Sequence, residues 1–285
     1  MDAALVPFEA RPAGVLVRGR RGGTGPTALL LHGTAGSWRN FRDWLPALLP
    51  RGHLVIPNLP GFGESPAPPL RPRLLTWARL VHALTAELRA PPRILVGLGL
   101  GASVAMAYLA VAGRADPPLT HLVLHTPPYY PGAIRPVFRH AARLLTTPPL
   151  FAVVRGLHAQ PRFRDWYLRR LVEGPDVPAE AARLLREDFE RTSLAVLRGL
   201  VRDQVRADFR RLLRGCRAPT LAIVAENDPF VYPAEVERLA ALMPRATVVV
   251  QRHVGHGWTP EAVAEQNALL ATFLDQGSTA SAAKA

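Results

Sequence analysis

Three glycine-containing stretches carry the residue types through which this chain could do chemistry. One of them, Gly97-Leu98-Gly99-Leu100-Gly101-Ala102-Ser103, lies between a short apolar run and a longer run with helical spacing. A turn that opens a helix offers the unpaired N–H groups of the first helical turn, which can bind an anion or stabilise a developing negative charge. The other two, Leu31–Ser37 and Asn58–Ser65, also follow apolar runs. All three therefore predict backbone-lined turns at the ends of strands.

Acidic and basic side chains near the C-terminus could supply proton transfer. Glu226 and Asp228 directly follow an apolar run, and His256 precedes a stretch with helical spacing. Each of these, taken alone, is most simply a solvent-facing group of a turn or loop. A carboxylate that orients a histidine ring, however, makes a general base. Whether the pair meets depends on the elements that position it.

Apolar runs of two kinds alternate along the chain. Short β-rich runs, several without polar alternation, are typical of strands buried on both faces. Longer runs with helical spacing lie between them, which predicts a mostly parallel sheet of about eight strands flanked by helices. A hairpin near residues 15–18 adds an antiparallel edge. The predicted strands are 28–31, 54–56, 93–96, 119–124, 220–224 and 246–250, and the predicted helices are 40–49, 74–89, 102–112, 234–242 and 260–274.

The alternation stops between about residues 127 and 214. This stretch has helical spacing, several prolines and 17 arginines, but no strand-like run. A helical insertion between two strands predicts a lid over the carboxyl edge of the sheet, where open α/β sheets bind ligands. We therefore expect an α/β core domain formed by residues 1–126 and 215–276, a helical lid at 127–214, and a flexible tail at 277–285.

Composition narrows the class of protein. The net charge is +13, and Lys284 is the only lysine among 35 basic residues. A basic balance can indicate nucleic acid or acidic lipid. Because the arginines are scattered and mostly alternate with carboxylates, we prefer a codon bias toward arginine and expect no nucleic-acid partner. No membrane span or secretory signal is predicted, and the one cysteine, Cys216, fits a reducing, cytoplasmic setting.

In order, spacing and context, the three glycine-containing stretches resemble the α/β-hydrolase superfamily. The likeness covers about residues 15–274 and favours the lidded subgroup of esterases, carbon–carbon bond hydrolases and epoxide hydrolases. It implies a nucleophile on the sharp strand-to-helix turn of a G-x-S-x-G motif. Gly97 and Gly101 match the flanking glycines, but the serine position holds Gly99, and the preceding position, often histidine, holds Leu98. The resemblance thus implies a nucleophile elbow without a hydroxyl.

The remaining parts of the family's site have counterparts in this chain. By position and by order along the chain, the resemblance implies Asp228 as the acid and His256 as the histidine. The oxyanion hole would be formed by backbone N–H groups of Leu100 and of Thr34 or Ala35. Backbone donors do not depend on a serine side chain, so they survive its loss.

Other candidates fit these roles less well. Glu226 is an alternate acid beside Asp228. Ser103 lies one helical turn beyond Gly99 and is most simply a packing residue, and Cys216 precedes a buried strand and is interpreted as structural. Residues 97–102 also match the dinucleotide fingerprint G-x-G-x-x-A, but the next predicted strand ends without the acidic residue that the fingerprint requires. We expect no cofactor, and no metal, because the histidines are dispersed without ligand spacing.

These observations favour an atypical enzyme of the α/β-hydrolase family that acts on a small apolar carbonyl or ester-type substrate. His256, oriented by Asp228, would act as general base without a serine nucleophile. Phe62, Tyr129 and Tyr130 follow strand ends and are expected to line the substrate pocket. The alternatives are a non-catalytic ligand-binding protein and a decayed hydrolase. Glycine at the elbow either relieves backbone strain or leaves space for water or a substrate atom.

Overall fold

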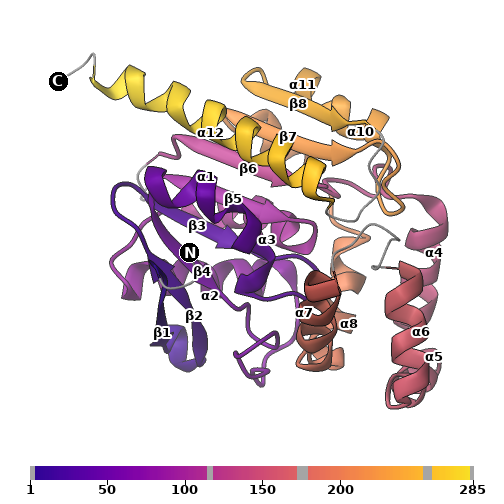
Figure 1. Ribbon diagram of the computed structural model, residues 1–285. Helices are drawn as coiled ribbons and strands as arrows, with labels where there is room; N and C mark the ends of the chain where they lie inside the picture. The colour runs from indigo at the N-terminus through magenta and orange to yellow at the C-terminus, as the bar shows by residue number, and fades with distance from the viewer. Residues whose placement is uncertain (1–3, 114–117, 172–178, 253–258, 283–285) are drawn as a thin grey trace.

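An eight-stranded sheet forms the centre of the computed structural model, which describes residues 4–113, 118–171, 179–252 and 259–282 (Figure 1). The strand order is β1-β2-β4-β3-β5-β6-β7-β8. The first two pairings are antiparallel and the other five are parallel, which confirms the predicted fold class. The strands are β1 (Val6–Ala10), β2 (Val17–Gly22), β3 (Thr27–Leu31), β4 (His53–Pro57), β5 (Ile94–Leu98), β6 (His121–His125), β7 (Thr220–Ala225) and β8 (Ala246–Gln251).

Two hydrophobic cores lie on the two faces of this sheet, and alternate residues of each strand divide between them. In β3, Leu29 and Leu31 join the core under α2 and α3, whereas Ala28 and Leu30 join the core under α1 and α12. Successive strand residues point to opposite faces, so a strand that is covered twice must be apolar throughout. This is why β3 to β7 show near-continuous apolar runs.

The helices on the two faces are α1 and α12 on one side and α2, α3, α10 and α11 on the other. Two predicted helices are broken: residues 38–44 form a 3-10 helix before α1, and residues 233–242 divide into α10 and α11. The last helix extends into the stretch 277–285, where a flexible tail is predicted. The bounds are α1 (Leu45–Leu48), α2 (Leu74–Glu87), α3 (Leu100–Ala112), α10 (Pro233–Glu237), α11 (Leu239–Leu242) and α12 (Pro260–Ala282).

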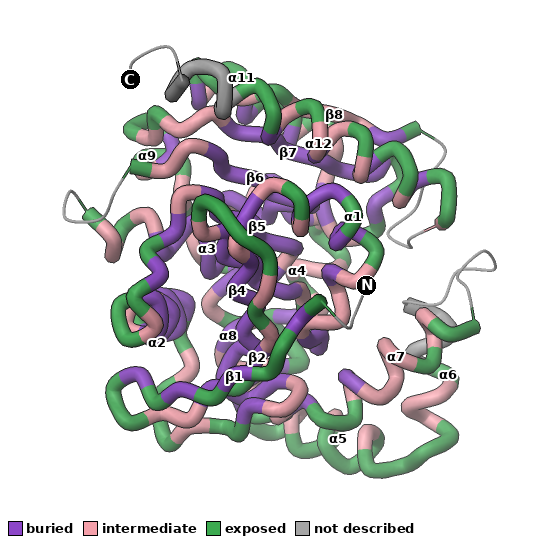
Figure 2. Tube along the Cα trace, turned by 60° about the vertical axis from the view of Figure 1, so that its left-hand side comes forward, coloured by how far each residue is buried: buried purple, intermediate pink, exposed green. Residues whose placement is uncertain are grey.

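Only helices connect β6 to β7 in the described residues, apart from one isolated bridge between Ile134 and Val231. α8 packs on the core through buried Val196 and Leu200, whereas α5 and α6 stand off to one side and have no buried residue among those whose burial is described (Figure 2). These helices are α4 (Pro136–Leu145), α5 (Pro148–His158), α6 (Pro161–Leu171), α7 (Ala179–Glu190), α8 (Leu194–Gln204) and α9 (Arg210–Arg214). None of the helices searched across the described residues is long and apolar enough to span a membrane.

Candidate active site

A sharp turn at Gly99 joins β5 to α3. Gly99 has φ +50° and ψ −103°, a backbone conformation that is strained for residues with a Cβ atom. Its N–H donates to the carbonyl of His125 at 2.9 Å, and its carbonyl accepts from the amide of Ser103 at 3.2 Å. A Cβ atom built on Gly99 meets no atom of the described residues within 4 Å. The turn therefore keeps the strained geometry and has room for a side chain.

The flanking glycines are required by close packing around this turn. A Cβ atom on Gly97 would lie 2.6 Å from the Cα of Ala102, and one on Gly101 would lie 2.0 Å from the carbonyl oxygen of Leu31. Real Cβ atoms do not approach other atoms this closely, so only glycine lets α3 begin against β3 and β5. The conformation of residue 99 is thus imposed by its neighbours, whatever that residue is.

Candidate oxyanion donors come from the turn and from the loop after β3. The amide of Leu100 belongs to the first turn of α3, where N–H groups have no helical acceptor. Leu31 pairs with Gly97 across β3 and β5, and a Cβ atom on Gly33 would lie 3.5 Å from the carbonyl oxygen of Leu98. Thr34 and Ala35 follow Gly33 in this loop, so the loop and the turn lie at the same edge of the sheet, and their shared role as an oxyanion hole stays a prediction.

His32 holds the loop after β3 in place. Its ring is fully buried, which lowers its pKa to about 4 and keeps it neutral. The Nε2 atom accepts from the amide of Leu59 at 2.9 Å, so the proton resides on Nδ1, which lies 2.9 Å from the carbonyl oxygen of Gly33. Asn40 accepts from the amide of Gly33 at 3.2 Å. The stretches 31–37 and 58–65 are therefore braced against each other.

Asp228 lies two strands away, just past the end of β7, and is completely buried. One carboxylate oxygen accepts from the amides of Phe230 at 2.8 Å and Val231 at 2.9 Å. The hydroxyl of Thr126 donates to the other oxygen at 3.4 Å. The Arg135 guanidinium binds the carbonyl of Asp228 at 2.7 Å. Charge-stabilising amides hold this carboxylate in a fixed orientation, as an acid that positions a base requires.

The two candidate acids differ in environment. Glu226 is exposed at the end of β7, so burial distinguishes Asp228 from its neighbour. His256 lies outside the described residues. β8, the strand that precedes it in the sequence, pairs with β7 up to Ala225 and Gln251. The histidine's place relative to Asp228 stays a prediction from the resemblance.

A buried polar chain that sequence reasoning missed leads from α12 to the acid. Gln266 accepts from the indole of Trp44 at 2.8 Å and donates to Gln251 at 2.7 Å. Its amide nitrogen lies 3.5 Å from Nε2 of His125, whose Nδ1 lies 3.3 Å from the hydroxyl of Thr126. Thr126 has φ +49°, which is rare for a β-branched residue. No sequence motif marks these residues, because their side chains come together only when α12 packs against the sheet.

The residues expected to line the pocket are mostly packed into the core. Phe62 is fully buried and contacts the edge of the His32 ring. Tyr129 donates to the carbonyl of Glu235 at 2.8 Å, and burial raises its pKa to about 12. Tyr130 donates to the Glu235 carboxylate at 2.5 Å and remains half-buried. Both phenols bind α10, so pocket lining by these three residues stays a prediction.

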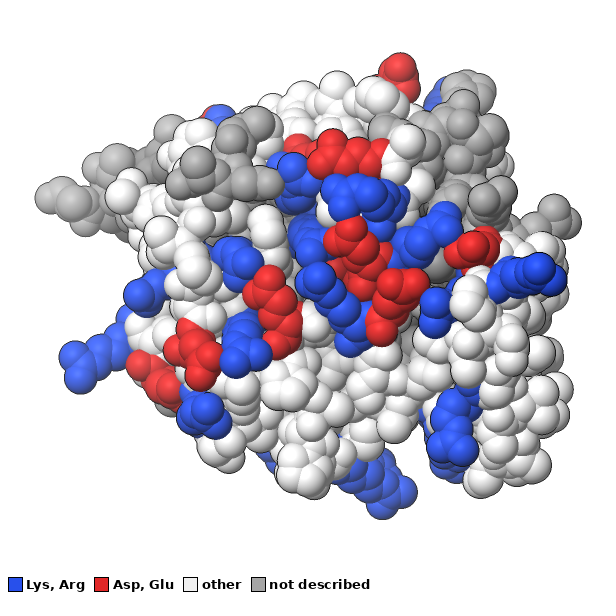
Figure 3. Space-filling model, turned by 60° about the horizontal axis from the view of Figure 1, so that its bottom comes forward, with Lys and Arg blue, Asp and Glu red and all other residues white. Residues whose placement is uncertain are grey.

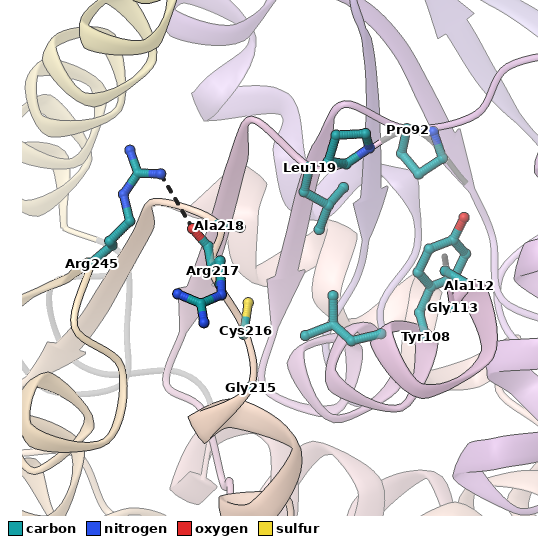
Figure 4. A pocket seen from close by; sticks show the side chains of 12 residues that line it. Pro92, Tyr108, Ala112, Gly113, Leu119, Gly215, Cys216, Arg217, Ala218 and Arg245 are labelled. Atoms are coloured by element: carbon teal, nitrogen blue, oxygen red, sulfur yellow. Dashed lines mark hydrogen bonds between the residues drawn. The ribbon is translucent and has the colours of Figure 1, made fainter. Parts of the chain in front are cut away.

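Ser103 and Cys216 have surroundings that fit structural roles. Ser103 is buried and accepts from Gln204 at 3.0 Å. Cys216 borders a hollow of about 480 Å³, which Leu119, Arg217 and Arg245 also line (Figure 4). This hollow lies at the amino ends of β5 to β8, the opposite edge of the sheet. Burial raises the pKa of the Cys216 thiol, which keeps it protonated and a poor nucleophile.

Charged side chains fasten α7 to the loop that carries Thr34. The hydroxyl of Ser37 donates to buried Asp188 at 2.6 Å, and the Arg39 guanidinium binds Glu187 at 2.8 Å. Burial raises the pKa of Asp188 despite these donors. Acidic and basic side chains interleave across one face of the molecule (Figure 3). The helical insertion is thus linked directly to the candidate site's loop.

A comparison with protein-family models matches residues 28–266 to the alpha/beta hydrolase family. The chain belongs to this family. It is 26% identical to Lipase 3 of Moraxella sp. (strain TA144) over 245 residues, 84% of this chain and 74% of the lipase. A solved esterase of Thermogutta terrifontis has a TM-score of 0.74 and 22% identity, covering 95% of this chain and 99% of the esterase.

A second solved structure is similar in fold and carries a glycine substitution of its own. It is a serine-to-glycine variant of the N-acyl homoserine lactonase AidH, complexed with N-hexanoyl homoserine lactone. Its TM-score is 0.74 and its identity to this hydrolase-family chain is 19%, covering 96% of this chain and 99% of the lactonase. Among the described residues, no group of three or more His, Cys, Asp or Glu side chains could hold a metal ion.

Proposed function

We propose that this α/β-hydrolase-family chain hydrolyses a small apolar ester or related carbonyl compound without a covalent nucleophile. The observation that carries the proposal is the turn at Gly99, which keeps the backbone conformation of an elbow and where no atom of the described residues fills the space of a side chain. Esterases and lipases among its relatives support the substrate class.

In the proposed reaction a water molecule occupies the space beside Gly99. His256, oriented by the Asp228 carboxylate, removes a proton from this water as its oxygen attacks the carbonyl carbon. The amides of Leu100 and of Thr34 or Ala35 hold the resulting oxyanion. When the tetrahedral intermediate collapses, the leaving alkoxide takes the proton from His256. Ester and water are consumed, and acid and alcohol are released.

The general base and the oxyanion donors each have an expected contribution to the rate enhancement. A positioned general base contributes roughly 10²–10⁴-fold, and one oxyanion donor is worth about 10²–10³-fold. These two effects do not need a serine side chain, although a covalent route would add to them. The proposed enzyme is therefore slower than an esterase with a full triad, but well above the rate in water.

Matched acid variants test the proposal. Asp228→Asn removes the carboxylate charge that orients the base, and Glu226→Gln removes an exposed carboxylate two residues away. We expect turnover of short-chain esters and acyl lactones to fall by about 10²-fold or more in the first variant and to stay unchanged in the second. Equal activities in both variants, with both proteins folded, would contradict the proposed role of Asp228.

A ligand-binding function is the second candidate. The serine-to-glycine variant of the lactonase AidH complexed with a lactone supports it, because that glycine variant holds an ester-type ligand on this fold. Mass spectrometry of ligand recovered from an excess of protein separates the two functions. Intact ester or lactone after prolonged binding favours the binding protein, whereas acid and alcohol favour the enzyme.

A further inference from the structure

The helices α4, α5 and α6 expose an unusual concentration of large apolar side chains. Of the nine large hydrophobic residues that are exposed in the described part of the chain, six belong to these helices. Val137 is 83% exposed and Trp166 is 59% exposed. We call this set the α4–α6 surface; its apolar members are Val137, Leu144, Leu145, Val153, Leu157 and Trp166.

These side chains form stripes on their helices. Val153 and Leu157 are four residues apart on α5, and Val137 and Leu144 are seven apart on α4, spacings that place side chains on one helical face. The three helices follow one another in sequence. α5 and α6 stand to one side of the sheet in both the ribbon and the tube views (Figures 1 and 2), and α4 packs against α5. The exposed apolar residues are thus gathered on a projecting part of the molecule, away from the two cores.

The same part of the chain is strongly cationic. Residues 136–171, which span the three helices, contain seven arginines and a single acidic residue, Asp165. Arg143, Arg155 and Arg162 are exposed, and no carboxylate of the described residues forms an ion pair with them. Elsewhere arginines lie against carboxylates, as in the pairs Arg39–Glu187 and Arg20–Glu64. On α6, Arg164 and Asp165 are paired with Glu190 and Arg186 of α7. The arginines Arg143, Arg155 and Arg162, unpaired within the described residues, are therefore where positive charge and exposed apolar area coincide on the α4–α6 surface.

We propose that the α4–α6 surface docks the protein on an anionic lipid bilayer. Apolar side chains on such a surface enter the boundary between headgroups and acyl chains, while arginines contact the lipid phosphates. A second copy of this chain fits poorly, because two faces with unneutralised arginines repel each other. The helices lie on the membrane and do not cross it. This proposal does not depend on the proposed hydrolysis, since its test measures binding of the protein to lipid vesicles and not turnover.

Vesicle co-sedimentation of the full chain tests this docking. The probes are phosphatidylcholine vesicles and equimolar phosphatidylcholine–phosphatidylglycerol vesicles. We expect binding to the anionic vesicles only, weakened by salt. The triple variant R143Q/R155Q/R162Q should lower the partition coefficient on the order of 100-fold, because each basic residue near an anionic surface contributes a factor of about five.

A matched triple variant separates local docking from the overall charge. R71Q/R73Q/R79Q removes the same charge from exposed positions before and within α2, and we expect it to change binding by less than about fivefold. Equal losses in the two triple variants would overturn the proposal. So would the absence of binding to anionic vesicles by the native chain.

A separate experiment tests whether the apolar side chains of the α4–α6 surface enter the bilayer. Brominated phosphatidylglycerol quenches tryptophans that enter the acyl region, so quenching in the native protein should largely disappear in Trp166→Phe. V153S/L157S changes exposed positions and should weaken vesicle binding without lowering thermal stability. Unchanged quenching in Trp166→Phe would contradict insertion. Self-association of the native chain that V153S/L157S abolishes, without vesicle binding, would assign the surface to a second copy.

Discussion

The substitution Gly99→Ser places a hydroxyl in the space that the turn leaves open. No atom in the described part of the chain lies within 4 Å of a Cβ atom at this position, so none of those neighbours has to move. The close packing around Gly97 and Gly101 holds the backbone at φ +50° and ψ −103°, so a serine at position 99 would adopt the same conformation. The new hydroxyl would therefore stand at the amino end of α3, beside the amide of Leu100.

Two magnitudes follow from this geometry. A residue with a Cβ atom in such a strained conformation costs roughly 1–3 kcal/mol of folding free energy, which lowers the melting temperature by several degrees. Loss of the serine in a serine protease costs about 10⁶-fold in turnover, which sets the ceiling for its restoration. A misplacement of about 1 Å costs roughly 10²-fold. We therefore expect Gly99→Ser to raise ester hydrolysis by about 10⁴-fold.

Hydrolysis of a short-chain p-nitrophenyl ester at neutral pH measures this gain, and labelling by a fluorophosphonate, read by mass spectrometry, identifies the reacting residue. Gly99→Ala is the control, because it carries the same backbone strain without a hydroxyl. We expect Gly99→Ser to gain activity and be labelled at residue 99, and Gly99→Ala to do neither. A folded Gly99→Ser protein no more active than Gly99→Ala would refute the inference that acid, base and oxyanion donors are aligned.

Three further predictions concern stability. Gly101→Ala should cost about 3 kcal/mol or more, because its Cβ atom would overlap a backbone oxygen, whereas Gly156→Ala on α5, with nothing within 4 Å, should stabilise by about 0.5–1 kcal/mol; thermal unfolding of both variants checks the contrast. His32 has a folded pKa of about 4 against 6.5 when unfolded, so its neutral burial should cost about 3 kcal/mol of stability as pH falls from 6.5 to 4. Urea unfolding across this range should show a shallower loss in His32→Asn, and parallel curves would contradict the assignment. Ser37→Ala should cost about 1–3 kcal/mol by removing the donor of a buried carboxylate, and urea unfolding at pH 7 that shows no change would dismiss this bond as a stabilising contact.

Much of the fold follows from periodicity alone. The strand predictions 28–31 and 220–224 lie within one residue of β3 and β7, because buried parallel strands leave continuous apolar runs. The predicted helix at 40–49 instead begins as a 3-10 helix capped by Ser37. Local capping and packing against the core determine whether a short helix is a 3-10 or an α-helix and where it breaks. The spacing of apolar residues therefore does not predict either feature.

The candidate site likewise has parts that the sequence predicts and parts that it does not. Gly97 and Gly101 can be recognised in sequence, because close backbone approach leaves glycine as the only residue that fits. Burial separates Asp228 from Glu226, and that difference arises from the long-range packing of the loop after β7. Thr126 and Gln266 have no local signal, since Thr126 meets Asp228 and Gln266 meets His125 across more than a hundred residues of sequence.

The turnover number of the native protein beside that of His256→Ala, at saturating ester or lactone, tests the central claim most directly. The account predicts that the native chain turns over repeatedly and that the variant falls by roughly 10²–10⁴-fold while still binding substrate. Equal turnover in the two proteins would contradict a histidine general base acting beside Gly99.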